Sequence, residues 1–374
     1  MIFIIIITTV LYSLLIGSFV IGFNKIRMFN EPFLRHLTRF TIIVPFRNEE
    51  EHLSDLIKSL ESLNYPKNHF EVIFVDDDST DNSVELSSRL LSCSQLDFQI
   101  IKNNRASNSP KKDAITTAIK KAKYHWIATT DADCEVPNTW LEISNSFINS
   151  YDVAMIVAPV VFKSSDSFFN QFQALDMLSL QAATIGGFGL SFPFLCNGAN
   201  LMYRKDLFKE LNGFENNDDI ASGDDIFLLE KAIKKYPELV KYMKSKNAIV
   251  FTKVETSLSD LIQQRIRWAS KTSTYKNAFG KFVGLLVLLV NALIVITLFL
   301  SVFGLFYWLY FVAVLILKLS VDYILLYKSV NFFNQKHLLN NYFFSGLLYP
   351  FFVVFIAFKA MFSTYKWKDR SFKK

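Results

Sequence analysis

The sequence predicts an α/β fold with a mixed, mostly parallel sheet covered by helices on both faces, joined to transmembrane α-helices. Three observations support this prediction. Long apolar runs lie near both ends of the 374 residues, strand-like and helix-like segments alternate between them, and polar clusters follow the strand-like segments. Alternating strands and helices form parallel sheets covered on both faces, and such sheets bind their ligands at the carboxyl ends of the strands.

The first apolar run, residues 1–23, contains no charged side chain. It is long enough to cross a bilayer, which takes roughly 20 apolar residues. Basic residues follow this run, whereas a cleaved signal peptide begins with them and ends in a cleavage site of small residues. By the positive-inside rule the N-terminus lies outside, and residues 24–281 form one cytosolic domain. The basic residues after the run are Lys25, Arg27, Arg35 and Arg39.

The C-terminal part predicts three more membrane segments. Residues 282–327 have the length of a transmembrane helical hairpin with its bend near Gly304. Residues 342–362 form a third segment, and a basic tail follows at residues 363–374. One crossing before the domain and three after it would place the tail outside, whereas the positive-inside rule favours the cytoplasm. Because Pro350 can break the last segment into a re-entrant or interfacial element, its topology stays open.

Few charged residues interrupt the apolar runs. Lys318 and Asp322 are four residues apart, and an ion pair on one helix face is the favoured interpretation, with a path for substrate or lipid as the alternative. The net charge is +6, and much of the basic excess flanks apolar segments, which fits anionic lipid headgroups better than nucleic acid. Unrelated cysteine spacings predict reduced thiols in a cytosolic domain, at Cys93, Cys134 and Cys196.

The central domain begins with four expected strands separated by helices. The segment FTIIVPF is rich in strand-forming residues. The segment after it repeats leucine and isoleucine at helical spacing, with acidic residues in its first turn. The expected strands lie in residues 40–46, 71–80, 98–101 and 125–137, and the expected helices in residues 49–63, 81–91 and 110–122.

Polar clusters follow three of these strands. If residues 127–130 form a strand, Asp131 and Asp133 project to the same side, because side chains alternate along a strand. Two such carboxylates offer the hard oxygens that Mg²⁺ or Mn²⁺ binds together with substrate phosphates. A solvated turn is the alternative for this D-x-D pair alone, and the three aligned strand ends favour the metal site. The clusters are PFRNEE at 45–50, VDDDST at 75–80 and TDAD at 130–133.

Several stretches of the chain, taken in order, resemble a known family. They are IIVPFRNEE, VDDDSTDNS, KKDAI, TTDADCEVP, GANLMYRKDLF with NGF, SGDD and QQRIRW. Their order and spacing between residues 41 and 270 are similar to those of the inverting family 2 glycosyltransferases with the GT-A fold, which is Rossmann-like. The flanking apolar segments resemble the membrane-integrated branch of that family, which includes ceramide glucosyltransferase and the cellulose, chitin, hyaluronan and poly-N-acetylglucosamine synthases.

The resemblance implies a nucleotide-sugar donor site with a metal ion at the strand ends. Asp131 and Asp133 match the carboxylates that hold Mg²⁺ or Mn²⁺ and the diphosphate of the nucleotide. Turn capping is the alternative for Asp76 and Asp78, and it is favoured for Asp78. The residues that the resemblance places beside the nucleotide are Pro45, Asn48, Glu49 and, at uracil or ribose, Asp77.

Lys111 takes the place of the donor-binding lysine in the family's G-K-x-x-A-L-N stretch. This sequence departs from that stretch, because Pro110 replaces the glycine, Ile115 the leucine and Thr116 the asparagine. Lys112 is therefore the alternative to Lys111.

The SGDD stretch matches the family's base motif at the start of a helix. Asp225 takes the position of the catalytic base and Asp224 the acidic position before it. In an inverting transfer one base takes the proton of the acceptor hydroxyl as this attacks the anomeric carbon. Capping of the helix by Asp224 or Asp225 is the alternative.

The QQRIRW stretch aligns with Q-x-x-R-W of the family. The resemblance implies that Arg267 neutralises the diphosphate and that Trp268 and Gln264 contact the acceptor sugar or headgroup. Arginine suits the first role because its fork holds phosphate oxygens bidentately. Anchoring at the membrane interface is the alternative for Arg267 and Trp268.

Taken together, the resemblance implies an integral membrane glycosyltransferase of a bacterial inner (plasma) membrane, with its catalytic domain in the cytoplasm. It would move a sugar from a nucleotide donor, expected to be UDP, to a membrane lipid or glycan. A processive polysaccharide synthase is one alternative, and an inactive membrane scaffold or binding protein with this fold is another. The few membrane segments favour single transfer. The donor sugar, acceptor, linkage and oligomeric state stay open.

Overall fold

The computed structural model describes residues 2–30, 36–163, 166–217, 220, 222–270, 276–362, 365–368 and 370–372. Its contacts divide the chain into two compact units. We call residues 27–163 and 196–253 the sheet unit, and residues 1–26, 164–195 and 254–374 the helical unit. Arg35 and residues 363–364, 369 and 373–374 of the expected basic tail lie outside the described residues.

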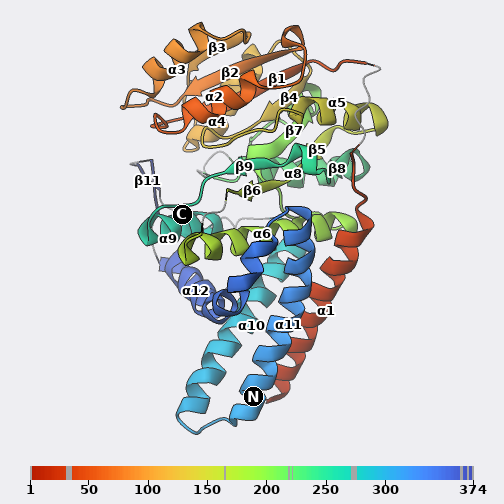
Figure 1. The fold of residues 1–374 in the computed structure, drawn as a ribbon, viewed down its shortest axis with the longest axis vertical. Coiled ribbons are helices and arrows are strands. Elements are labelled where there is room, and N and C mark those ends of the chain that lie inside the picture. The colour runs from red at the N-terminus through yellow and green to blue at the C-terminus, as the bar shows by residue number, and fades with distance from the viewer. Residues whose placement is uncertain are drawn as a thin grey trace. The chain divides into compact units, whose positions relative to one another are not determined.

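The sheet unit is built on a seven-stranded sheet in the order β3-β2-β1-β4-β7-β5-β8 (Figure 1). The pairs among the first four strands are parallel, β7 runs antiparallel to both β4 and β5, and β8 is parallel to β5. The sheet is therefore mixed and mostly parallel, which confirms the predicted fold class. The strands are β1 Phe40–Phe46, β2 Phe70–Asp76, β3 Phe98–Lys102, β4 Trp126–Thr129, β5 Met155–Val157, β7 Leu201–Arg204 and β8 Val240–Tyr242; β6 Val160–Phe162 and β9 Val250–Thr252 form a separate parallel pair.

Three helices link the first four strands: α2 Leu53–Glu61, α3 Ser83–Ser92 and α4 Pro110–Lys121. The first two lead outward from β1 to β3, and α4 returns to β4 on the other side of β1. Because parallel crossovers are right-handed, α4 covers the face opposite α2 and α3. The chain changes direction between β1 and β4, and ligands of such sheets bind outside the carboxyl ends of strands at this point.

The remaining helices of the sheet unit are α5 Trp140–Ser150, α7 Lys205–Glu210 and α8 Asp224–Lys235.

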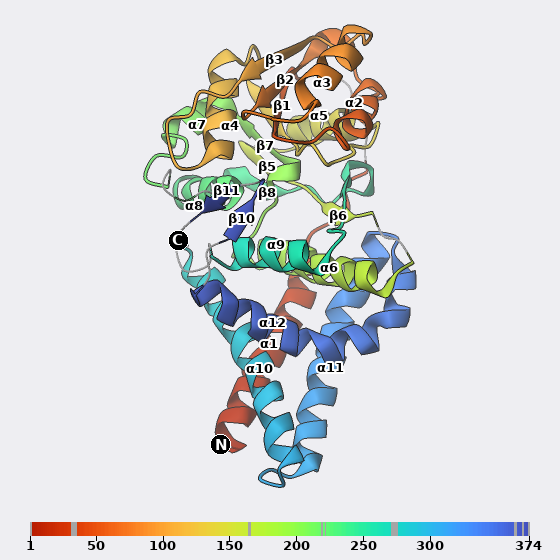
Figure 2. The same cartoon turned by 90° about the vertical axis from the view of Figure 1, so that its left-hand side faces the viewer.

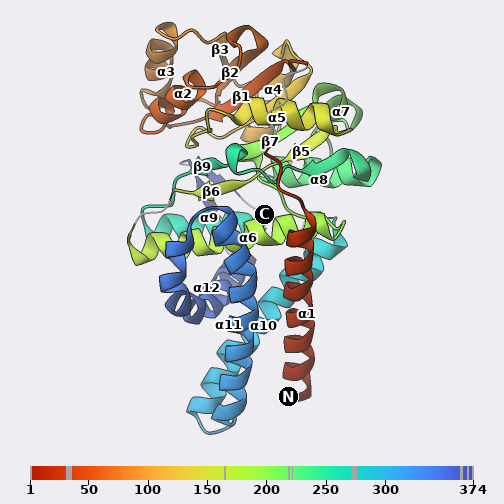
Figure 3. The same ribbon diagram turned by 45° about the vertical axis from the view of Figure 1, so that its right-hand side comes forward.

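Three helices of the helical unit run alongside one another (Figures 1 and 3). They are α1 Ile2–Lys25, α10 Ala278–Val302 and α11 Trp308–Phe332, each long and apolar enough to cross a membrane. The chain turns between α10 and α11 around Gly304, whose φ is +70°. Near this turn the helices share an apolar cluster made by Ile5, Ile294, Phe306 and Phe311.

The last long helix, α12 Tyr342–Phe362, is continuous with Pro350 inside it, so Pro350 does not break this segment. α12 is also long and apolar enough to cross a membrane. Figure 1 looks nearly along its axis, and Figure 2, turned by 90°, shows it lying across α10 and α11 rather than alongside them. A short 3₁₀ helix, Lys336–Asn341, precedes α12, and the hairpin β10 Tyr365–Trp367 and β11 Arg370–Phe372 follows it.

Two further helices of the helical unit, α6 Phe168–Gly189 and α9 Leu258–Ser270, lie side by side (Figure 2). α6 crosses α1 so closely that a Cβ added to Gly22 would lie 2.1 Å from the carbonyl oxygen of Gly186. Small residues permit such close approach of helices in membranes. The sequence prediction placed both helices in the cytosolic domain, and the contacts of the structure group them with α1, α10, α11 and α12 in the helical unit.

Candidate active site

The amino end of α4 meets two carboxylates from other parts of the sheet unit. Lys111 Nζ lies 2.6 Å from Asp131 Oδ1 and 3.4 Å from Asp224 Oδ2. Asp131 follows β4 and Asp224 opens α8, so the lysine joins a strand end to a helix start. Side-chain exposure is 20% for Lys111 and 35% for Asp131. Three residues predicted to act together are therefore in contact and in part open to solvent.

The charges of this cluster compensate one another. Burial acts to lower the pKa of Lys111, but the carboxylates of Asp131 and Asp224 outweigh it and raise that pKa. Burial raises the pKa of Asp131, while Lys111 opposes this rise and Asp133 adds to it. The lysine is therefore charged at neutral pH and offsets the repulsion among neighbouring carboxylates.

Asp131 and Asp133 lie in a turn rather than in a strand. β4 ends at Thr129, and the backbone N–H of Cys134 donates to the carbonyl of Asp131 at 3.2 Å. Alternation along a strand therefore does not explain how this pair is arranged, contrary to the sequence argument. The turn nevertheless brings the carboxylates close enough for Asp133 to raise the pKa of Asp131. Asp133 Oδ2 accepts a hydrogen bond from Thr252 Oγ1 at 3.2 Å.

The oxygen chemistry of this turn fits a divalent cation that arrives with a phosphate. Across the described ranges of the chain, no group of three or more His, Cys, Asp or Glu side chains is arranged to hold a metal ion. Asp131 and Asp133 are the carboxylates that this turn offers to such a cation. Mg²⁺ sites of this kind bind through one or two carboxylates and complete the shell with substrate phosphates and water.

The two acidic residues of SGDD lie in the first turn of α8. Gly223 is the N-cap residue and has φ +84°, so neither Asp224 nor Asp225 takes the capping position proposed as the alternative. Negative charge in the first turn is favoured by the helix dipole. Asp225 Oδ2 accepts from the N–H of Gly198 at 3.0 Å, and its Oδ1 accepts from the N–H of Ile226 at 2.8 Å. Asp225 is the more exposed of the two aspartates.

Gly198 belongs to this site, although the sequence analysis did not assign it. A Cβ at Gly198 would lie 3.0 Å from Asp224 Oδ2 and 3.4 Å from Lys111 Nζ. Its carbonyl accepts from Thr129 Oγ1 at 2.7 Å. The glycine therefore allows the chain to pass closely between β4 and the start of α8. The glycine of GAN is visible in the sequence, but only the fold shows what lies against it.

Asp77 is held by two side chains that the sequence prediction missed. Arg105 donates two hydrogen bonds to its carboxylate, from Nε to Oδ1 and from Nη2 to Oδ2, each at 2.8 Å. Asn103 Nδ2 donates to the same Oδ1 at 2.7 Å. Asp113 of α4 fixes this loop by accepting from the backbone N–H of Ser107 at 2.9 Å. A polar loop after a strand carries no local signal for this pairing.

The loop after β1 is tied to the loop after β2. Asn48 has φ +50°, and its Oδ1 accepts from the N–H of Thr80 at 2.8 Å. The N–H of Glu49 donates to Ser83 Oγ at 2.8 Å. Pro45 lies within β1, one residue before its end. The three residues predicted to meet the nucleotide thus lie at the carboxyl end of β1.

The aspartate that caps the turn after β2 is Asp76, and not Asp78, which the sequence analysis favoured for this role. Asp76 Oδ1 accepts from the N–H of Ser79 at 3.0 Å. Asp78 has φ +58° and pairs with Lys102 at 3.1 Å on the surface.

Lys112 does not substitute for Lys111. Its side chain is 1% exposed, and Nζ donates to the carbonyls of Asn217 at 2.6 Å and Ile220 at 2.8 Å. The ammonium also lies 4.7 Å from the ring centroid of Phe227. Lys112 therefore holds the segment that leads into Gly223 and α8, and this role is structural.

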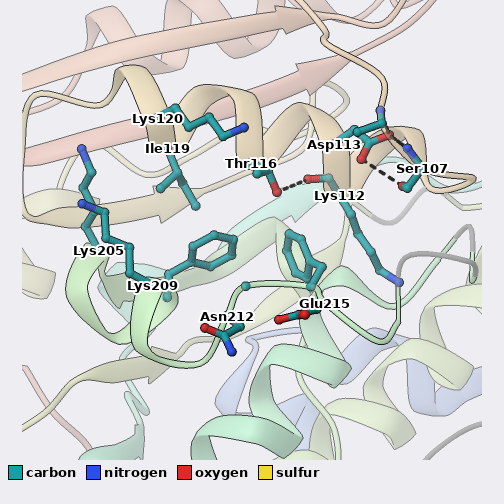
Figure 4. Close-up of a pocket in the computed structure, with 14 residues that line it drawn as sticks. Ser107, Lys112, Asp113, Thr116, Ile119, Lys120, Lys205, Lys209, Asn212 and Glu215 are labelled. Atoms are coloured by element: carbon teal, nitrogen blue, oxygen red, sulfur yellow. Dashed lines mark hydrogen bonds between the residues drawn. The ribbon is translucent and has the colours of Figure 1, made fainter.

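A separate cavity of about 570 Å³ lies between α4 and residues 205–215 (Figure 4). Figure 4 shows Lys112, Asp113 and Thr116 on the α4 side and Glu215 on the other. No residue assigned to the donor site lines this cavity.

Replacing Lys112 by Met is expected to destabilise the chain by about 2 kcal/mol, because two buried carbonyls lose a charged donor. The melting temperature of the purified protein in detergent should fall by several degrees. Lys102→Met is the matched control, since Lys102 pairs on the surface with 77% of its side chain exposed. Equal melting temperatures for the two variants would contradict the role assigned to Lys112.

The Q-x-x-R-W residues lie on α9 of the helical unit. Gln264, which was predicted to contact the acceptor sugar or headgroup, is hydrogen-bonded within the protein. Its Nε2 donates to Glu255 Oε1 at 2.6 Å. Trp268 is half-buried, and the guanidinium carbon of Arg265 lies 4.2 Å from its ring centroid. Arg267 lies in the last turn of α9. The structure therefore brings Gln264 and Trp268 together around Arg265, which the sequence prediction did not assign.

Comparison with known proteins points to one family. The sequence pattern of glycosyl transferase family 2 matches residues 41–211. A poly-beta-1,6-N-acetyl-D-glucosamine synthase of Staphylococcus epidermidis is 22% identical over 265 residues, covering 68% of this chain and 61% of that protein. A beta-monoglucosyldiacylglycerol synthase of Nostoc sp. is 26% identical over 195 residues, covering 50% of this chain and 41% of the relative. The chain thus spans less than two thirds of the length of these relatives.

A solved structure shares the fold over almost the whole chain. The mannosyltransferase PcManGT from Pyrobaculum calidifontis, in complex with GDP-Man and Mn²⁺, superposes with a TM-score of 0.58 at 17% identity and covers 96% of both chains. The family pattern therefore covers residues 41–211 of this chain, and the solved mannosyltransferase shares the fold of its mostly parallel sheet and helices.

Proposed function

We propose that the chain is an inverting glycosyltransferase that moves a sugar from a nucleotide donor, UDP in the favoured case, to a lipid or glycan acceptor at a membrane. The observation that carries the proposal is the cluster of Lys111, Asp131 and Asp224 at the carboxyl end of β4, with Asp225 beside it. A strand-end crevice of this fold is where ligands bind. The solved mannosyltransferase contains a nucleotide sugar and Mn²⁺, which supports this donor class.

The proposed reaction is a single displacement. The acceptor hydroxyl forms a bond to the anomeric carbon while the bond to the nucleotide diphosphate breaks, and that electron pair leaves with the diphosphate. Asp225 takes the hydroxyl proton, which fits its exposure and its two backbone hydrogen bonds. Asp224 is buried beside Lys111, and this pairing leaves it less suited to the role of base.

Lys111 and the nucleotide loops would bind the donor. The ammonium of Lys111 offers positive charge to phosphate oxygens, and Pro45, Asn48, Glu49 and Asp77 lie at the neighbouring strand ends. Asp131 and Asp133 would hold Mg²⁺ or Mn²⁺, which stabilises the departing diphosphate as a Lewis acid. Arg267, Trp268 and Gln264 keep the roles that the family resemblance implies, at the diphosphate and the acceptor.

Replacing Asp133 by Asn should weaken metal-dependent donor binding, because a neutral amide offers a hard cation less charge. Titrating a UDP-sugar with and without Mn²⁺ measures this dependence. Asp97→Asn is the control, since Asp97 pairs with Lys123 on the surface. A dependence on Mn²⁺ equal to that of the parent would remove Asp133 from the metal site.

The arrangement of α12 suggests an assignment that removes the conflict in the predicted topology. If α1, α10 and α11 cross the membrane and α12 lies along its cytosolic surface, the basic tail returns to the cytoplasm, as the positive-inside rule requires. The transverse course of α12 in Figures 1 and 2 supports this assignment. The sheet unit then faces the cytoplasm, where nucleotide sugars are made.

Cysteine labelling tests this orientation. Cys93 is exposed, whereas Cys134 is buried, and burial raises the pKa of its thiol. In a Cys196→Ser background, a membrane-impermeant maleimide should label Cys93 only after cells are permeabilised. Leu305→Cys, at the exposed turn after α10, should label in intact cells. Labelling of Cys93 in intact cells would overturn the orientation.

A processive synthase is the second candidate, supported by the relative that makes poly-N-acetylglucosamine. The small number of helices in the described ranges that are long and apolar enough to cross a membrane favours single transfer. The name of another relative, beta-monoglucosyldiacylglycerol synthase, describes a product that is a lipid.

Donor turnover by the purified chain separates an enzyme from an inactive scaffold. Protein in lipid vesicles is incubated with UDP-glucose, UDP-galactose, UDP-N-acetylglucosamine or GDP-mannose in the presence of Mn²⁺, and released nucleotide diphosphate is measured. We expect release from one donor and its loss with EDTA. Inertness towards all four donors, with vesicles made from lipid extract, would favour the scaffold.

A further inference from the structure

Two buried charges join α6 to α9 within the helical unit. Arg265 Nε donates to Asp176 Oδ2 at 2.7 Å, and the two side chains are only 6% and 7% exposed. Arg265 Nη1 also donates to Gln264 Oε1. Arg265 occupies one of the two unspecified positions of Q-x-x-R-W, so the family resemblance assigned it no role.

α6 also holds the segment that leads into α9. Gln173 is fully buried, and its Nε2 donates to the carbonyl of Glu255 at 3.0 Å while its Oε1 accepts from the N–H of Glu255 at 3.0 Å. Glu255 Oε1 in turn accepts from Gln264 Nε2 at 2.6 Å. Side chains of α6 therefore fix both the entry to α9 and its middle.

Arg265 links this pair to the tryptophan of the same helix. Its guanidinium carbon lies 4.2 Å from the ring centroid of Trp268, close enough for a strong cation–π contact. The carboxylate of Asp176 sets the direction of the guanidinium, and the guanidinium covers one side of the indole. Asp176 thus reaches Trp268 through a single intermediate side chain.

The pair is connected to the membrane helices by α12 and α11. Tyr349 of α12 lies close enough to Asp176 to interact with its carboxylate, and the ammonium of Lys318 lies 5.2 Å from the Tyr349 ring centroid. Lys318 pairs with Asp322 at 3.0 Å, which confirms the ion pair favoured from the sequence. Asp322 Oδ1 also accepts from the hydroxyl of Tyr12 on α1 at 2.6 Å. Polar side chains therefore link α9, α6, α12, α11 and α1.

A buried ion pair contributes little net free energy to folding, because the cost of removing two charges from water is about as large as the attraction between them. Its best-supported use is to fix one arrangement among several that apolar packing would allow. Here the arrangement that it fixes is the orientation of the Arg265 guanidinium against the ring of Trp268.

We infer that Asp176 and Arg265 are positioning residues that orient Trp268 for the acceptor. The inference rests on the proposed function, in which Trp268 is the acceptor platform. A displacement of about 1 Å in a positioned reactant can cost roughly 10²-fold in rate. Loss of the pair should therefore act on transfer to the acceptor, and it should leave the donor site of the sheet unit intact.

The experiment compares two reactions of the full chain in vesicles of bacterial lipid extract. One is transfer of sugar from the donor to lipid, and the other is hydrolysis of the same donor in detergent without acceptor. Asp176→Asn should lower transfer at least about 10-fold through the apparent KM for lipid, with hydrolysis within two-fold of the parent. Arg265→Lys should behave similarly, because lysine keeps the charge but lacks the fork and the flat stacking surface.

A double variant tests whether transfer is lost only because the protein no longer folds. Asp176→Leu with Arg265→Met replaces the pair by apolar side chains of similar size, a change that usually preserves stability. We expect a melting temperature near that of the parent and transfer still about 10-fold lower. If the double variant transfers normally, packing alone is sufficient and the inference fails. A parallel fall of transfer and hydrolysis in Asp176→Asn would likewise show a general structural role.

Trp268→Ala, measured in the same assay, separates this inference from the proposed function. If Trp268→Ala transfers normally, the acceptor role of α9 fails, and the positioning inference fails with it. If Trp268→Ala loses transfer while Asp176→Asn and Arg265→Lys keep it, the acceptor role survives and the positioning inference alone is overturned. Breaking the exposed pair of Lys235 and Glu210, 2.7 Å apart in the sheet unit, is the control and should change neither reaction.

Discussion

Asp225→Asn should lower transfer by about 10²–10⁴-fold, the effect usually lost with a general base. The asparagine keeps the size of the side chain, and its oxygen can still accept from the N–H of Gly198 or Ile226, so the start of α8 should be preserved. Donor affinity in the presence of Mn²⁺ should therefore stay within a few-fold of the parent. Single-turnover transfer and equilibrium binding of a UDP-sugar measure the two quantities separately.

Asp224→Asn is the informative comparison for this prediction. Asp224 is buried and lies 3.4 Å from Lys111, so its loss should weaken donor binding more than it slows the chemical step. If Asp225→Asn transfers within a few-fold of the parent while Asp224→Asn loses transfer, Asp224 is the base instead.

Trp268→Ala should abolish transfer to the acceptor and leave donor binding nearly unchanged. As an acceptor platform, the indole positions the attacking hydroxyl, and misplacement by about 1 Å can cost roughly 10²-fold. Trp268→Phe should be intermediate, because a smaller ring preserves part of the surface. As an interfacial anchor, by contrast, the tryptophan would be replaced by Phe or Tyr with little loss.

Trp308 provides the control for this substitution. It opens α11, is 51% exposed and has the location of an interfacial anchor. Trp308→Ala should transfer within about two-fold of the parent if it inserts normally. Full transfer by Trp268→Ala would identify Trp268 as an interfacial anchor like Trp308, and it would weaken the Q-x-x-R-W assignment.

The sequence was informative wherever local pattern decides structure. The leucine and isoleucine spacing of α2 and the β-rich run of β1 are local, and the structure confirms both elements. The order of strands and helices then determines a mostly parallel sheet, because few connections are compatible with right-handed crossovers. Lys111, Asp131 and Asp224 were assigned through the family resemblance, and the fold brings these strand-end and helix-start residues into contact.

The features that the sequence did not predict depend on contacts between distant segments. Arg105 reaches Asp77 across two loops, and Lys112 holds carbonyls more than 100 residues away. A backbone carbonyl leaves no trace in sequence, so the role of Lys112 was not recognisable. The turn at Asp131 was misread because strand alternation was extended beyond the residue where β4 ends.

The assignment of α6 and α9 shows a different limit. Each helix is less apolar than α1 or α10, so composition placed it with the cytosolic domain. Their contacts group them with the helical unit, because Gly186 meets Gly22 of α1 and Asp176 meets Arg265. Hydropathy detects segments that face lipid, whereas these helices are held by polar pairs and close glycine contacts.

Product mass spectrometry tests the central claim most directly. The purified chain in vesicles of bacterial lipid extract is supplied with Mn²⁺ and one of the four nucleotide sugars at a time, with Asp225→Asn as the matched control. The account predicts a new species heavier than an acceptor by one sugar residue, formed with a single donor and absent with EDTA or with Asp225→Asn. A product formed equally by Asp225→Asn, or no product with any donor, would contradict it.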